Sequence, residues 1–139
     1  MKGIKKLIKY WLPVVVWMGV IYMFSTLPTG TASAIVWTDF IVKKTAHLTE
    51  YGILSLLIYR GLINSGFKKE EAAGVAIVTS LFYGMSDEWH QSFTPGRMPK
   101  AYDVIFDTIG ATLAIYLLWN TLPKMPKRLK NWAKAWELV

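Results

Sequence analysis

Chemically active side chains gather in the stretch 87–97, which follows a long apolar segment. The stretch holds two carboxylates, an imidazole, an amide and a guanidinium: Asp87, Glu88, His90, Gln91 and Arg97. Such groups are costly inside lipid, and they usually serve a function there. Asp87 and Glu88 could act as general acid and base, or as oxygen ligands of a divalent cation. The alternative is a lattice of salt bridges that only locks helices together.

Basic partners for these acids lie in the same stretch and in an earlier one. His47 could relay protons near neutral pH, and we expect it in the site ahead of His90. Arg97 follows a Pro-Gly turn, which could aim its guanidinium as a two-pronged clamp for phosphate or carboxylate. Its alternative role is an anchor on lipid phosphates. For Lys44 the same two roles are open, and its neighbour His47 favours the site.

Helical spacing predicts that three segments each carry one polar stripe. The stripes are Lys44, His47 and Tyr51; Tyr83, Asp87 and Gln91; and Asp103, Asp107 and Gly110. Small residues four apart, Ser80 with Gly84 and Gly110 with Ala114, would let the helices approach closely. We therefore expect a shared polar chamber, with His47, Asp87 and Glu88 as catalytic candidates. The expected substrate-binding residues are Lys44, Glu50, Tyr51, Tyr83, Gln91, Arg97, Asp103 and Asp107.

The elements that must position these residues are predicted to be membrane helices. The chain has 139 residues, 53% of them hydrophobic, and a mean hydropathy of +0.31, which is high for a water-soluble domain. No charged side chain lies between Lys9 and Asp39, a run longer than the roughly 20 residues that span a bilayer. Together with three later apolar stretches this predicts one all-α domain, residues 1–139, with a bundle of four transmembrane helices over about 8–28, 44–63, 71–93 and 102–122.

Two amphipathic segments are predicted to lie at the membrane surfaces. Trp37, Phe40 and Ile41 are spaced for a short helix in the outer interface, and the basic tail 124–139 for a C-terminal amphipathic helix at the inner one. The first apolar segment could also be a signal peptide, with Ala32-Ser33-Ala34 as the cleavage site. Its length favours an uncleaved anchor.

Charge placement predicts the orientation of the chain. The net charge of +7 is concentrated at the ends of the apolar segments and not on a polar face, which argues against a nucleic-acid binder. The positive-inside rule places both termini and the loop around Lys68 in the cytoplasm, so the motif-bearing loops face outward. The absence of cysteine excludes disulfides and thiolate chemistry.

Three motifs carry a resemblance to the VanZ-like family of small multi-helix membrane proteins. They are Lys44-x-x-His47-x-x-Glu50-Tyr51, the run from Tyr83-Gly84 through Asp87-Glu88 and Gln91 to Pro95-Gly96-Arg97, and Asp103 followed by Gly110-Ala111. Phe24-Ser25 also fits, whereas Asp107 stands where the family pattern tends to have asparagine. The resemblance implies a role in the cell envelope, since the best-known member is associated with teicoplanin resistance.

The leading hypothesis is an outward-facing site in the cytoplasmic membrane. It would bind or act on a lipid-linked cell-wall precursor or a lipoglycopeptide, with membrane lipids as further partners. Whether the site is catalytic stays open, and a divalent cation is compatible with its carboxylates. The alternatives are a proton or ion pathway through Glu50 and a purely structural assembly protein.

Overall fold

The computed structural model describes residues 2–26, 36–95 and 100–139, and all regular secondary structure within them is helical. Four long helices come first: α1 (Lys2–Thr26), α2 (Val36–Asn64), α3 (Lys69–Gln91) and α4 (Ala101–Tyr116). A π-helical turn η1 (Leu117–Thr121) and a 3-10 turn η2 (Leu122–Lys124) extend α4, and α5 (Lys127–Ala135) follows. The predicted all-helical fold and the C-terminal amphipathic helix are confirmed.

The prediction of a separate short helix in the outer interface is wrong in its boundaries. The sequence reading separates a short interfacial helix around Trp37 from a membrane helix that begins at Lys44, whereas α2 is one helix from Val36. No proline or glycine interrupts the chain between Val36 and Gly52, so hydrogen bonding continues through both stretches. The side chains of Trp37 and Phe40 lie outside the described residues.

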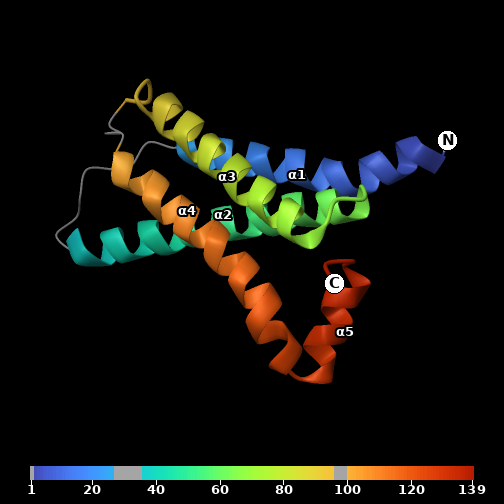
Figure 1. Cartoon of the computed structure of the whole chain (residues 1–139). Helices are drawn as coiled ribbons and strands as arrows, with labels where there is room; N and C mark the ends of the chain where they lie inside the picture. The colour runs from blue at the N-terminus through green and yellow to red at the C-terminus, as the bar shows by residue number, and fades with distance from the viewer. Residues whose placement is uncertain (1, 27–35, 96–99) are drawn as a thin grey trace.

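In space α2 is the central element. Figure 1 shows α1, α2 and α3 running side by side, while α4 crosses the bundle and leads away from it toward α5. Helix α2 packs against α1, α3 and α4. Glycines permit the crossing with α4: a methyl group on Gly110 would collide with the Leu48 backbone, and one on Gly52 would lie 3.3 Å from the Gly110 carbonyl oxygen. The predicted close approach at Gly110 is thus confirmed.

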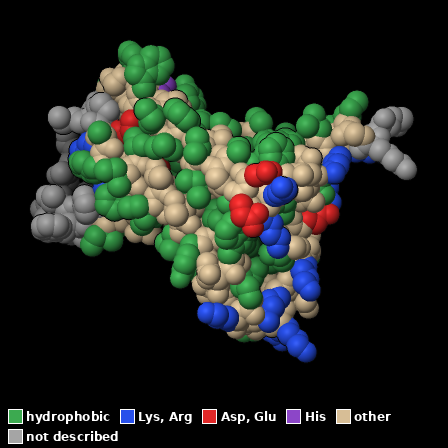
Figure 2. Space-filling model, viewed as in Figure 1, with side chains coloured by type: hydrophobic (Ala, Val, Ile, Leu, Met, Phe, Trp, Pro, Cys, Tyr) green, Lys and Arg blue, Asp and Glu red, His purple; other side chains and the backbone are tan. Residues whose placement is uncertain are grey.

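Apolar side chains form the core and also make up much of the outer surface. Leu54, Ile58, Tyr59 and Ile115 are buried, but large apolar side chains along α1 and α4 stay exposed, and Figure 2 shows them spread over the visible face. Two segments, Gly3–Thr26 and Ala101–Lys124, are long and apolar enough to cross a membrane. Helices α2 and α3 carry more charge, and their crossing stays a prediction.

A cluster of polar contacts holds the tail after α5 against the ends of α1 and α2. The buried Arg60 donates from Nε to the Trp136 carbonyl at 2.6 Å, and its guanidinium lies over the Tyr10 ring. Lys9 pairs with Glu137 at 2.8 Å. Glu137 has a left-handed φ of 54°, which a non-glycine residue adopts only when its contacts hold it there. We call the end of the bundle that carries these contacts and α5 the basic end.

Candidate functional site

The three polar stripes meet at the other end of the bundle, where α2 begins, α3 ends and α4 begins. One face of each helix points to the two others because its members recur every three or four residues. Tyr51 and Asp107 are 0% exposed, Asp87 5% and Glu88 6%. We call these residues, with Lys44, His47, Gln91 and Asp103, the polar site.

Two acid–base pairs join α2 to α4 within the polar site. Lys44 pairs with Asp103, and its ammonium group lies 4.4 Å from the ring centre of Tyr102 and 5.2 Å from that of Phe106. One turn further along, Nδ1 of His47 lies 2.8 Å from Oδ1 of Asp107. This contact orients the imidazole and leaves its Nε2 as the nitrogen for any further partner.

The acids of α3 have different partners. Oδ2 of Asp87 accepts a hydrogen bond from the Gln91 amide at 2.9 Å. Oε2 of Glu88 accepts one from the backbone N–H of Lys100 at 2.7 Å, which ties the start of α4 to the end of α3. Both carboxylates also interact electrostatically with Asp107. In the described part of the chain, four buried carboxylates therefore share the polar site with one lysine and one imidazole.

Three polar atoms of the site are buried and have no hydrogen-bond partner among the described residues. They are the hydroxyl of Tyr51, Oε1 of Glu88 and Oδ2 of Asp107, one from each helix. Gly84 brings two of these residues together, since a methyl group built on it would lie 2.8 Å from Asp107 Oδ2 and 3.4 Å from Tyr51 Cε1. Buried polar groups in proteins are almost always paired, so these atoms call for water or a ligand.

Two further expected site residues, Tyr83 and Glu50, and the neighbouring His90 make contacts with α1. The Tyr83 hydroxyl donates to the Met18 carbonyl of α1 at 2.6 Å. At Glu50 the backbone carbonyl accepts a hydrogen bond from the Trp17 indole at 2.9 Å. His90 stacks on Tyr22 with ring centres 4.3 Å apart. These contacts fix α1 beside the polar site. Arg97 lies outside the described residues.

A divalent cation finds no ready-made site in residues 2–26, 36–95 and 100–139. No three His, Asp or Glu side chains there lie close enough together to hold a metal ion. Three of the four carboxylates are instead paired with Lys44, His47 or Gln91. The polar site as described is thus a set of hydrogen-bonding and acid–base groups.

Sequence reasoning missed two contributors to the polar site and the role of a third. Tyr102 and Phe106 cradle the Lys44 ammonium, and their spacing of four residues around Asp103 was the available signal. Gly84 was identified as a small residue, but its contact is with Asp107 and Tyr51 side chains and not with another backbone. Its role is to make room for the site.

One of three comparisons with known proteins finds a match. Searches of curated proteins and of solved structures find no match. A family model described as VanZ/LLP1 matches residues 9–122, which include most of α1, all of α2, α3 and α4, and the whole polar site but leave out α5. Because the match covers most of the chain, this protein belongs to the VanZ/LLP1 family.

Proposed function

We propose that the chain is a multi-pass protein of the cytoplasmic membrane, with four crossings and both termini in the cytoplasm. The cations of α1, of the α2–α3 turn and of α5 all belong to the basic end, as expected of the cytoplasmic side. Figure 2 shows Lys and Arg side chains gathered around α5. In this orientation the polar site lies toward the outer side of the membrane.

The polar site is proposed to bind the head group of a lipid-linked cell-wall precursor or of a lipoglycopeptide, and so to contribute to teicoplanin-type resistance. The observation that carries this proposal is that one buried polar atom on each of Tyr51, Glu88 and Asp107 has no hydrogen-bond partner in the described part of the chain. A head group rich in hydroxyl and amide groups can donate hydrogen bonds to the two carboxylates and accept one from the phenol. Arg97 is proposed to contact an anionic part of the same ligand.

The same groups are able to support catalysis. Asp87 or Glu88 would remove a proton from a nucleophile, and His47, oriented by Asp107, would relay it. Lys44 and Arg97 would stabilise the anionic head group. Incubation of the purified protein with envelope lipids, followed by product analysis, distinguishes the two modes. Turnover that Asp87→Asn abolishes indicates an enzyme, and binding without product indicates a binding protein.

Glycopeptide susceptibility of cells tests the proposed function. We expect Glu88→Gln, Asp87→Asn and Arg97→Ala each to lose the protection that the wild-type chain gives, at equal membrane levels. Glu70→Gln is the matched control, since it makes the same change on α3 at an exposed position in its first turn. Full protection by Glu88→Gln, or equal loss with Glu70→Gln, would refute the assignment of the polar site.

A proton pathway is the second candidate function. The hydroxyls of Ser55 and Ser80 are 0% exposed and have no hydrogen-bond partner among the described residues. Ser55 lies one helical turn from Tyr51 on α2, and Ser80 lies one turn from Gly84 on α3, in both cases toward the basic end. Buried polar groups therefore continue inward from the polar site. Proton flux into liposomes that is the same for wild type and Glu50→Gln would remove this candidate.

A further inference from the structure

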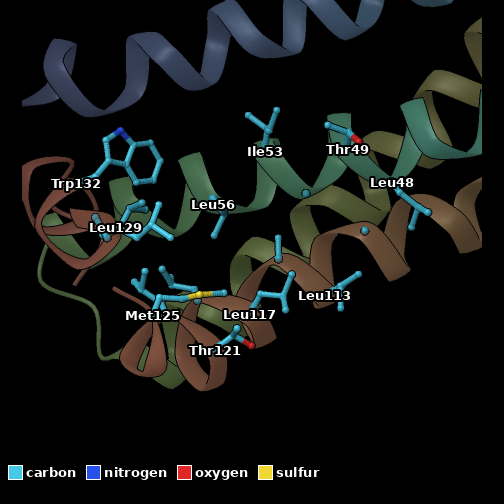
Figure 3. Close-up of a pocket in the computed structure, with 17 residues that line it drawn as sticks. Leu48, Thr49, Ile53, Leu56, Leu113, Leu117, Thr121, Met125, Leu129 and Trp132 are labelled. Carbon is cyan, nitrogen blue, oxygen red and sulfur yellow. The ribbon is translucent and has the colours of Figure 1, made fainter. Parts of the chain in front are cut away.

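An apolar groove opens on the face of the α2–α4 pair that is turned away from the polar site. Its volume is about 490 Å³, within the range of small-molecule sites. Figure 3 shows its walls: Ile53 and Leu56 from α2, Leu113 from α4, Leu117 from η1, and Leu129 and Trp132 from α5. The contact between Gly52 and Gly110 forms its floor and separates it from the polar site.

The lining of the groove fits a hydrocarbon chain. It is almost wholly aliphatic, and the hydroxyl of Thr49, one of its two threonines, already donates to the Thr45 carbonyl within α2. After α4 the π-helical turn η1 and the 3-10 turn η2 lead to α5, whose Leu129 and Trp132 line one end of the groove (Figure 3). Because Leu129 and Trp132 close that end, a transmembrane helix of another protein could not lie along the whole groove and continue past it.

The helix that lines one end of the groove, α5, is rich in cations. Helix α5 presents Leu129 and Ala133 to the groove, and Arg128 and Lys130 flank Leu129 in the sequence. Lys124, Lys127 and Lys134 add further positive charge, while the acid of this tail, Glu137, is paired with Lys9. An apolar groove next to a cationic helix complements an acyl chain that carries an anionic head group.

We propose that the groove between α2, α4 and α5 binds an anionic phospholipid, with an acyl chain along Leu56, Leu113 and Leu117 and its phosphate held by one of the two cations that flank Leu129, Arg128 on one side of α5 or Lys130 on the other. In the proposed orientation this lipid belongs to the cytoplasmic leaflet. The site lies on the opposite face of α2 and α4 from the polar site, so the two can be tested separately.

Lipid binding to the purified full-length protein tests the proposal. Native mass spectrometry would measure the affinity for dioleoyl phosphatidylglycerol and dioleoyl phosphatidylcholine in detergent. At about fivefold per cation near a phosphate, we expect the wild type to prefer phosphatidylglycerol at least fivefold. Arg128→Glu combined with Lys130→Glu should abolish the preference. Lys5→Glu with Lys6→Glu, which makes the same charge change on α1, should keep it.

Filling the groove provides the second arm. Leu117→Trp, at a residue 45% exposed, should weaken phosphatidylglycerol binding at least tenfold, whereas Ile109→Trp, on α4 outside the groove lining, should leave it unchanged. Leu113→Trp serves as an independent filling variant if Leu117→Trp does not fold. Equal binding by the groove and control variants would overturn the proposal. A wild-type dimer that Leu117→Trp dissociates without a change in lipid binding would also overturn it, because the occupant would then be a second copy.

Discussion

His47 and Asp107 form a contact of 2.8 Å between Nδ1 and Oδ1, and this contact joins α2 to α4 where Gly84 of α3 also meets Asp107. Asp107 is fully buried, and its Oδ2 has no hydrogen-bond partner among the described residues. This oxygen therefore needs a water molecule or a ligand in the polar site as its partner. One residue thus links the packing of three helices to the proposed ligand.

Asp107→Asn should preserve the fold. The amide oxygen can accept a hydrogen bond from His47 as the carboxylate does, and the two side chains have nearly the same shape. Asp107→Leu should lower the free energy of unfolding by about 1–3 kcal/mol, because it removes the hydrogen-bond partner of Nδ1 on the half-buried His47. Unfolding in detergent micelles measures both. Equal destabilisation by Asn and Leu would show that the charge itself holds α2 to α4.

Gly110→Ala should destabilise the bundle by about 1–3 kcal/mol. The added methyl group meets the backbone of Leu48, which cannot rotate away as a side chain can. Gly19→Ala on α1 is the control, since no atom lies within 4 Å of the added carbon, and alanine favours the helix by up to about 1 kcal/mol. Thermal unfolding of the two variants should shift in opposite directions; a neutral Gly110→Ala would contradict the described crossing.

Tyr51→Phe and Tyr83→Phe should separate function from stability. Tyr83→Phe removes the hydrogen bond to Met18 and should cost about 0.5–1.5 kcal/mol while leaving glycopeptide protection intact. Tyr51→Phe removes a hydroxyl without a protein partner in the described residues, so stability should not fall, but protection should be lost. Unfolding and susceptibility assays on the same two variants check this. The reverse pattern would make Tyr51 a packing residue.

The docking of α5 should weaken in acid. The hydrogen bond from Lys9 lowers the pKa of Glu137 below its ordinary value. A carboxylate with a lowered folded-state pKa contributes stability that is fully present above the unfolded value, about 4.3, and is lost as the pH falls through the lower folded value. Hydrogen exchange of residues 127–135, corrected for intrinsic rates, should therefore be constant from pH 7 to about 5 and faster below about 4.

Glu137→Gln provides the control for this acid effect. The amide does not titrate, so exchange in α5 should be faster than in the wild type at pH 7 and should show no further step in acid. A wild-type profile that stays flat to pH 3 would show that the Lys9–Glu137 pair does not hold α5.

The sequence by itself determined the helices and their polar faces. Helix formation and the placement of Lys44, His47 and Tyr51 on one stripe depend on the local period of 3.6 residues, which is readable from spacing alone. The spacing of cations and apolar residues also predicts α5 as an amphipathic helix. The four-helix crossing of a membrane and the roles of the site residues stay predictions.

Tertiary structure decided which groups meet. Spacing could not show that Lys44 pairs with Asp103 and His47 with Asp107, or that Tyr83 turns to α1, because these contacts depend on how closely and at what angle helices cross. Likewise only the folded chain brings the Trp136 carbonyl to Arg60 and closes the groove with α5. Contacts between residues far apart in the chain arise from the packing of helices, and the spacing of residues along one helix does not predict that packing.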